Sequence, residues 1–121
     1  MASLFVTKDQ KDPEYYPLGL RTNVIGRDEA VPIQVLDDQI SRKHVQIYYD
    51  KDKKMFFAAD MKSKNGIFVN GQKIEKEMPL DDGDEIKIGN TTLTFMMEDF
   101  PDKQSALSKF KKVGERRKTT L

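Results

Sequence analysis

The sequence contains no cysteine and no tryptophan, and its 121 residues include a single histidine, His44. The absence of cysteine excludes disulfides, zinc–thiolate sites, iron–sulfur clusters and thiol nucleophiles, and it favours a reducing, cytoplasmic setting. A catalytic histidine needs a nucleophile or a metal partner, and this sequence offers His44 no cysteine and no second histidine. We therefore expect His44 to be a structural residue that hydrogen-bonds the loop backbone. No metal or other cofactor is expected, and the hypothesis developed below is a binding module that is not an enzyme.

Long apolar runs are also missing, since none approaches the roughly 20 residues of a membrane span. Residues 1–7 are too short and too uncharged for a signal peptide. These two absences predict a soluble intracellular protein that does not contact membranes. The length of the chain predicts one domain.

The net charge is small, +1, but it is unevenly distributed. Residues 1–102 hold 14 Lys and Arg and 19 Asp and Glu. Residues 103–121 hold seven Lys and Arg and a single Glu. An acidic body of net charge −5 therefore carries a basic tail of net charge +6. The negative charge of the body argues against nucleic-acid binding by the body. Three interpretations of the tail stay open: a linker to another domain, a contact with nucleic acid or acidic lipid, or a contact with the acidic body.

Short β-type segments separated by turn signals make up residues 1–100. Asn-Gly or Asp-Gly pairs at 65–66, 70–71 and 82–83 are typical of tight hairpin turns, and the polar stretch 8–17 is expected to be a loop. With about ten short strands and no helical period, the pattern predicts an all-β, antiparallel sandwich. The expected strands lie at residues 4–7, 18–25, 33–35, 45–49, 55–59, 67–69, 72–74, 85–88 and 91–97.

Residues 101–121 form the second predicted unit, a basic tail or linker. Apolar residues at 106, 107, 110 and 113 have the spacing of a short amphipathic helix, and beyond Gly114 we expect disorder. Thr119 and Thr120 follow three basic residues, a context that suits a basophilic kinase, and they are candidate phosphorylation sites.

Polar, cationic segments lie at the ends of several predicted strands, where the loops of a sandwich gather. If three of these loops share one end, their side chains form an anion site. An arginine fork, a serine hydroxyl and backbone N–H groups suit a phosphate ester better than a carboxylate, and an asparagine amide suits an extended peptide backbone. The side chains concerned are Arg27, Ser41, Arg42, Lys43, Lys62, Ser63, Lys64 and Asn65.

The order and spacing of these segments resemble the forkhead-associated (FHA) domain family over about residues 3–98. The resemblance implies a sandwich of about eleven strands that binds phosphothreonine peptides through loops at one end. The matching blocks are VIGR at 24–27, ISRKH at 40–44, DMKSKNG at 60–66, FVNG at 68–71 and LDDGDEIKIG at 80–89.

The resemblance also implies roles for individual residues. Arg27 and Ser41 would contact the phosphate, and Lys64 would line the phosphothreonine pocket. Arg42 is placed to add a phosphate contact, and Asn65 would hydrogen-bond the peptide main chain. The loops would be shaped by Gly26, His44, Gly66 and Asn70.

The sequence thus predicts a module for phosphothreonine-dependent protein binding in signal transduction, with an upstream Ser/Thr kinase. The ligand would be another protein or the phosphorylated tail of this chain, which reaches about 70 Å when extended. Two alternatives stay open: a regulatory input domain of a larger enzyme or transcription regulator, and an interaction domain whose partner needs no phosphate.

Overall fold

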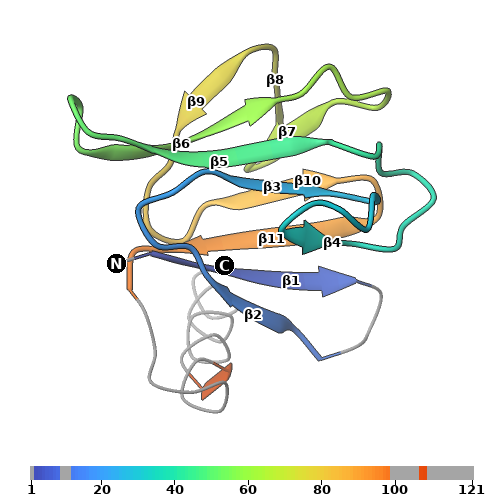
Figure 1. Cartoon of the computed structure of the whole chain (residues 1–121), viewed down its shortest axis with the longest axis horizontal. Coiled ribbons are helices and arrows are strands. Elements are labelled where there is room, and N and C mark those ends of the chain that lie inside the picture. The colour runs from blue at the N-terminus through green and yellow to red at the C-terminus, as the bar shows by residue number, and fades with distance from the viewer. Residues whose placement is uncertain (1, 9–11, 99–106, 109–121) are drawn as a thin grey trace.

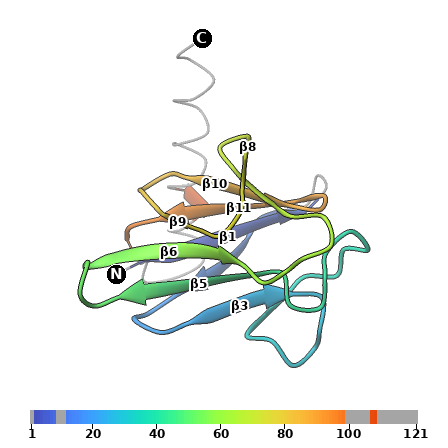
Figure 2. The same cartoon turned by 90° about the horizontal axis from the view of Figure 1, so that it is seen from above.

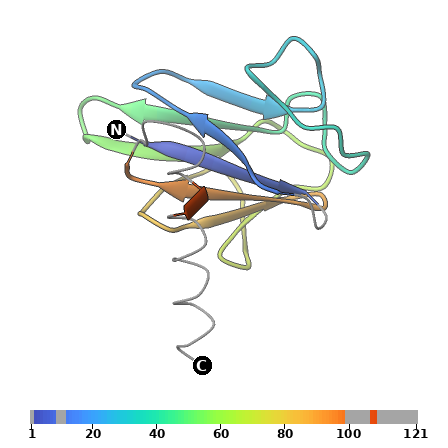
Figure 3. The same cartoon turned by 90° about the horizontal axis from the view of Figure 1, so that it is seen from below.

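The computed structural model describes residues 2–8, 12–98 and 107–108, and within them eleven β-strands form two sheets packed face to face (Figure 1). The six-stranded sheet has the order β2-β1-β11-β10-β7-β8 and consists of β1 (Ser3–Lys8), β2 (Glu14–Pro17), β7 (Ile67–Val69), β8 (Gln72–Ile74), β10 (Glu85–Ile88) and β11 (Thr91–Met96). The five-stranded sheet has the order β4-β3-β5-β6-β9 and consists of β3 (Asn23–Gly26), β4 (Ile33–Gln34), β5 (Val45–Asp50), β6 (Met55–Asp60) and β9 (Glu77–Pro79). The predicted all-β sandwich is confirmed, and its two layers are seen edge-on in Figures 2 and 3.

The core lies between the sheets and follows from the period of two in the strands. In β5, Val45 and Ile47 are fully buried, whereas the intervening Gln46 is partly exposed. Inward side chains of both sheets form one apolar cluster, which stabilises the sandwich by removing apolar surface from water. Its fully buried members include Leu4, Ile25, Val45, Ile47, Ile67, Ile86, Ile88, Leu93 and Phe95.

The structure corrects the strand predictions in three places. Residues 14–17 form β2 beside β1, because Tyr15 and Tyr16 favour a strand and Pro17 ends it at a sheet edge, where its missing N–H costs little. The segment 18–25 becomes a strand only from Asn23 onward. β9 was not predicted, because three residues ending in proline carry little periodic signal. One neighbouring pair, β3 and β4, is parallel.

The predicted hairpin turns differ in what they connect. Asn70 and Gly71, with φ values of 51° and 84°, join β7 to β8 in a tight hairpin, as predicted. The pairs at 65–66 and 82–83 instead connect strands of different sheets, so the hairpin prediction is wrong for both. Such a dipeptide specifies a local reversal of the backbone, whereas the partner of each strand depends on the whole sandwich.

The β3–β4, β4–β5 and β6–β7 loops all lie at one end of the sandwich, on the right in Figure 1. The β2–β3, β5–β6 and β9–β10 turns lie at the opposite end. Of the predicted tail, only Leu107 and Ser108 are described, so most of the expected helix, and Thr119 and Thr120, lie outside the described residues. In the described part of the chain, no helix is long and apolar enough to cross a membrane.

Candidate functional site

Three loops meet at the right-hand end of the sandwich and are joined by hydrogen bonds. They are residues 27–32 after β3, residues 35–44 after β4 and residues 61–66 after β6. The N–H of Arg27 donates to the carbonyl of Ser41 over 3.0 Å, and the N–H of Lys64 donates to Ser41 Oγ, also over 3.0 Å. Ser41 therefore connects the other two loops, and the three loops share one end as the anion-site hypothesis requires.

The Arg27 side chain is exposed and is positioned by one hydrogen bond. Its Nε donates to the carbonyl of Ile40 over 3.1 Å. This bond holds the planar guanidinium beside Ser41 and leaves the terminal N–H groups for a ligand. Within the described residues, no carboxylate forms an ion pair with Arg27.

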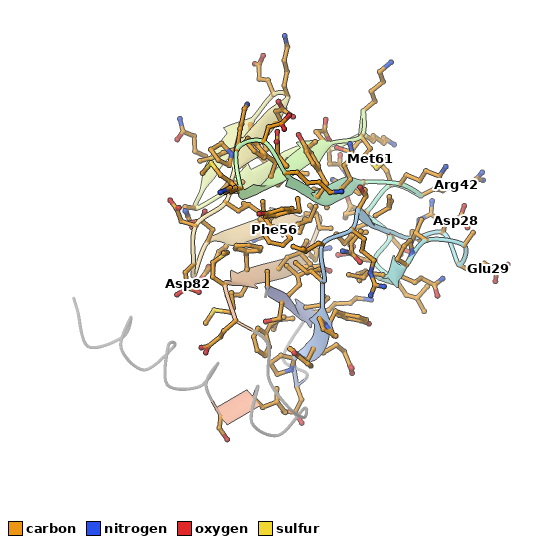
Figure 4. All side chains as sticks on the ribbon, turned by 60° about the vertical axis from the view of Figure 1, so that its left-hand side comes forward. Asp28, Glu29, Arg42, Phe56, Met61 and Asp82 are labelled. Carbon is orange, nitrogen blue, oxygen red and sulfur yellow. The ribbon has the colours of Figure 1, made fainter. Side chains whose placement is uncertain are left out.

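Gly26 allows the end of β3 to approach the β4–β5 loop. A Cβ atom at Gly26 would lie only 2.0 Å from the carbonyl oxygen of Arg42 and 2.7 Å from its carbonyl carbon. Only glycine avoids this clash with the main chain. The same Arg42 carbonyl accepts a hydrogen bond from the N–H of Asp28 over 3.2 Å. The exposed Arg42 side chain lies at this end of the molecule, well away from Asp82 at the other end (Figure 4).

His44 is fully buried and ties the loops together. Its Nδ1 accepts the N–H of Ser41 over 3.0 Å, and its Nε2 lies 2.7 Å from the carbonyl of Gly66, to which it donates. Its main chain bonds to Ile25 and Met61. Both ring nitrogens are therefore occupied in a neutral imidazole that carries its proton on Nε2. No ring nitrogen remains for a metal or a substrate.

The β6–β7 loop is also stabilised from within. The Ser63 hydroxyl donates to Asp60 Oδ1 and accepts the N–H of Gly66 over 3.0 Å. Sequence analysis counted Ser63 among the hydroxyls of the anion site, but both capacities of this hydroxyl are used inside the loop. The Ser41 hydroxyl is used differently, because its oxygen accepts the N–H of Lys64. Its proton is therefore left to donate to a ligand.

Asn65 is exposed and its amide is oriented by Gln39. The Nδ2 of Asn65 donates to the Gln39 carbonyl over 2.9 Å. The side-chain oxygen of Asn65 has no partner among the described residues. Sequence analysis missed Gln39, which lies 26 positions away and carries no recognisable signal.

Lys73, on β8, is a further cation that sequence analysis missed. Gly66 has a φ of 77°, and a Cβ atom there would lie 2.8 Å from Cε of Lys73 and 3.5 Å from its Nζ. Lys73 therefore lies against the turn that holds Asn65. The register of β7 with β8 places it there, and that register is not evident in the local sequence.

Asn70 does not join the cluster of loops. Its Nδ2 donates to Asp84 Oδ1, its Oδ1 accepts the N–H of Glu85, and its own N–H donates to the Glu85 carbonyl. Asn70 thus attaches the β7–β8 hairpin to the start of β10.

Asp37 attaches the β4–β5 loop to the β10–β11 turn. It is buried, and its carboxylate accepts the N–H groups of Gln39 and Asn90 and the hydroxyl of Thr91, over 2.8–2.9 Å. Burial by itself raises the pKa of Asp37, but these hydrogen bonds and the charge of Lys8 outweigh it and lower the pKa below its usual value. The loop that carries Ser41 is therefore anchored at both of its ends.

The surface of the cluster is rich in unpaired positive charge. Two acidic residues, Asp28 and Glu29, lie at the same end on the β3–β4 loop (Figure 4). The described residues include no group of three or more His, Asp or Glu side chains that could hold a metal ion. The exposed cations of the three loops, none of them ion-paired within the described part of the chain, are Arg27, Arg42, Lys43, Lys62 and Lys64.

Comparison with known proteins identifies the family. A family model of the FHA domain matches residues 23–89, more than half of the chain. The chain belongs to the FHA domain family. The match includes β3, the three loops and the strands up to β10, so it covers every residue of the cluster.

The FHA domain of this chain resembles segments of much longer proteins. It is 33% identical over 79 residues to mouse "Angiogenic factor with G patch and FHA domains 1", covering 59% of this chain and 11% of that protein. It is 30% identical over 95 residues to FhaA of Mycobacterium tuberculosis, covering 78% of this chain and 18% of that protein. The chain therefore spans less than a fifth of the length of either relative.

Solved FHA domains have the same fold. One, studied for phosphothreonine-dependent FHA domain interactions, has a TM-score of 0.69 and 30% identity, and the match covers 81% of this chain and 99% of that one. Another is Mycobacterium tuberculosis EmbR in complex with a low-affinity phosphopeptide, with a TM-score of 0.70 and 26% identity. That match covers 83% of this chain and 26% of EmbR.

Proposed function

We propose that this FHA domain binds protein segments that contain phosphothreonine. Arg27, Ser41, Arg42 and Lys64 hold the phosphate, and Asn65 bonds the adjacent peptide main chain. The observation that carries the proposal is the position of Ser41, hydrogen-bonded to the loops of Arg27 and Lys64 while its hydroxyl proton stays available.

The chemistry of the cluster suits a phosphate ester. A phosphothreonine carries about −1.5 to −2 charges at pH 7 and three acceptor oxygens. Arg27 offers several N–H donors in one plane, Ser41 offers a hydroxyl, and Lys64 and Arg42 add positive charge. Because Arg27 and Ser41 are already held by hydrogen bonds, little conformational entropy is lost on binding.

Discrimination against the unphosphorylated segment follows from the same contacts. Hydrogen bonds to charged groups contribute about 1.5–3 kcal/mol each, so losing two of them costs at least about 3 kcal/mol, or more than 100-fold in affinity. The site then functions as a reader of a kinase's product. An upstream Ser/Thr kinase, a cytoplasmic location and a non-enzymatic role in signalling belong to this proposal.

The relatives support the proposal. Among solved FHA domains with 26–30% identity, one was studied for phosphothreonine-dependent interactions and another is in complex with a phosphopeptide. The preference for threonine over serine rests on the family relationship.

Calorimetric titration with a phosphothreonine peptide library tests the proposal. The wild-type chain should bind selected peptides and ignore their unphosphorylated and phosphoserine forms. The Arg27→Ala variant should lose more than about 100-fold in affinity with an unchanged melting temperature, because the side chain is exposed. Arg21→Ala is the matched control, since Arg21 is an exposed arginine in the β2–β3 turn at the opposite end.

Two outcomes would contradict the proposal. One is binding that survives phosphatase treatment of the partner, which would favour an interaction domain that needs no phosphate. The other is equal affinity of the Arg27→Ala and Arg21→Ala variants for the same phosphopeptide.

A further inference from the structure

The outer face of the six-stranded sheet is covered on one side, over β1 and β11. In β1, Leu4 and Val6 point into the core, so Phe5 between them points outward, yet Phe5 is completely buried. Phe68 of β7 also points outward from this sheet, and it is 37% exposed. Phe5 is therefore covered from the side that faces away from the core.

Four neighbours of Phe5 share this burial, and with it they form what we call the outer patch. Phe5 lies opposite Thr94 of β11 and opposite Tyr15 of β2, whose ring centre is 5.6 Å from its own. On the same face, Ser3 lies opposite Met96. Tyr15 is partly buried, and Ser3, Thr94 and Met96 are at most 4% exposed. Because these side chains stand beside one another in a single layer, such burial requires atoms above the layer.

The chain that follows β11 turns back against the outer patch. The Ser3 hydroxyl donates to the carbonyl of Glu98 over 2.6 Å, so the main chain just beyond β11 lies against the patch. Leu107 and Ser108 are helical, and Leu107 is partly buried. Leu107 comes nine positions after Glu98, which corresponds to about 30 Å of extended chain. Leu107 can therefore reach any part of the patch.

The residues from Leu107 onward have the pattern of a cover for this patch. At helical spacing, Leu107, Phe110 and Val113 lie on one face. Ser108 and Lys112 lie on the opposite face. The outer patch contains no charged side chain, so it complements the apolar face of this segment.

Charge favours the same segment. The β9–β10 turn is acidic, since residues 81–84 include three aspartates, and Asp82 Oδ1 accepts the N–H of Met97 next to the patch. Residues 107–113 include three lysines and no acidic residue. Attraction between the two is screened by salt, so it adds to the apolar contact without replacing it.

We propose that the outer patch binds this chain's own C-terminal segment, residues 107–113, through Leu107 and Phe110. The tail is then docked on the domain instead of forming a free linker, and its contact with the acidic body is mainly apolar. The patch lies where β1 begins and β11 ends, on the left in Figure 1, whereas the three loops of the candidate site lie on the right. Docking of the tail is therefore separate from phosphothreonine binding.

Tryptophan fluorescence of the full chain tests the proposal, because the sequence contains no tryptophan. Phe110→Trp places an indole on the apolar face of the segment, and Lys112→Trp, the matched control, places one on the opposite face. The indole of Phe110→Trp should emit at a shorter wavelength and should be quenched several times less efficiently by acrylamide. Neither substitution removes the apolar contact, so both variants should fold.

Oxidation by hydrogen peroxide measures the cover from the side of the patch. Met96 is buried and the adjacent Met97 is 47% exposed, so Met97 should form its sulfoxide much faster than Met96 in the wild-type chain. Leu107→Asp/Phe110→Asp should remove this difference. Ser108→Asp/Lys112→Asp, the matched control, should keep it. Tandem mass spectrometry distinguishes the two sites, and urea unfolding checks that each variant is folded.

Three outcomes would overturn the proposal. One is equal quenching of the two tryptophan variants, which decides the question even if the Leu107→Asp/Phe110→Asp variant does not fold. The second is equal oxidation of Met96 and Met97 in the wild-type chain. The third is protection of Met96 that survives Leu107→Asp/Phe110→Asp. If that protection falls on dilution, a second copy of the chain covers the patch, and otherwise another part of the same chain does.

Discussion

Two regions of the sandwich are rich in exposed cations, and in only one of them do several loops converge. The β5–β6 turn at one end contains Lys51, Lys53 and Lys54 in four residues. Its hydrogen bonds are local, since Asp50 Oδ1 accepts the N–H groups of residues 52 and 53. One of its cations contacts an aromatic ring, since the Lys53 ammonium lies 5.1 Å from the centre of the Phe57 ring.

The loops at the other end are bonded to one another as well as within themselves. Ser41 joins the loops of Arg27 and Lys64, and the His44 ring joins Ser41 to Gly66 in the β6–β7 loop. Convergence of three loops on one point, and not the local density of positive charge, therefore distinguishes the candidate site. Variants in the three loops, each compared with a matched variant elsewhere, test this difference.

The largest effect is expected from Gly26→Ala. The new methyl group would overlap the Arg42 carbonyl at 2.0 Å and force the β4–β5 loop away from β3, which separates Ser41 from Arg27. We expect phosphopeptide affinity to fall more than about 100-fold and the free energy of unfolding to fall by about 1–3 kcal/mol. Calorimetric titration and urea unfolding measure the two effects.

Gly71→Ala is the matched control for this prediction. Gly71 has a φ of 84°, but a Cβ atom there would meet nothing within 4 Å. The variant should lose about 1–2 kcal/mol in the free energy of unfolding through backbone strain and keep its affinity for the phosphopeptide. Equal loss of affinity in the two glycine variants would show that general destabilisation, and not loop convergence, controls binding.

The next effect concerns Asp37, which anchors the loop of Ser41. In the Asp37→Asn variant, the amide NH₂ group faces at least one of the three groups that donate to the carboxylate. We therefore expect the free energy of unfolding at pH 7 to fall by about 2 kcal/mol. Because the folded pKa lies below the unfolded one, the ionised carboxylate stabilises the fold above about pH 4, and this contribution is lost as the pH falls through the folded pKa. Thermal unfolding of both proteins at pH 7 and pH 3 should show a difference that narrows in acid.

A difference of the same size at both pH values would contradict this prediction. It would mean that Asp37 stabilises the fold through its pattern of hydrogen bonds alone and that its charge contributes nothing.

A smaller effect is expected from Ser41→Ala, compared with Ser63→Ala in the neighbouring loop. Ser41 offers its hydroxyl proton to the ligand, so its loss should lower phosphopeptide affinity about tenfold. Ser63 bonds only within its loop, to Asp60 and Gly66, so its variant should lose stability by about 1 kcal/mol and lose less affinity than Ser41→Ala. The reverse order of affinities would place the ligand against the β6–β7 loop instead of Ser41.

Sequence reasoning succeeded where the signal is local. Alternation identified β5, and the Asn70-Gly71 pair identified the β7–β8 hairpin. The motif blocks around Arg27 and Ser41 identified the FHA family, and the structure shows that their loops meet. The roles of Arg27, Ser41, Arg42, Lys64 and Asn65 in binding stay predictions.

What sequence reasoning missed depends on residues far apart in the chain. Gln39 orients Asn65 from 26 positions away, and Asp37 bonds to Asn90 across 53 positions. Lys73 reaches Gly66 only through the register of β7 with β8. Such pairings are set by the packing of the two sheets, and no local pattern of residue types encodes them.

The smallest effect is expected in the β5–β6 turn itself. Lys53→Ala removes a cation from the face of the Phe57 ring, which should lower the free energy of unfolding by about 0.5 kcal/mol. Phosphopeptide affinity should change less than twofold, because the turn lies at the end of the sandwich opposite the three loops and the screening length is about 10 Å at 0.1 M salt. Calorimetric titration at low and moderate salt gives a sharper comparison. If Lys53→Ala weakened binding as much as Lys64→Ala, any exposed lysine would attract the phosphate equally, and the arrangement of Ser41 between its two neighbouring loops would not be needed.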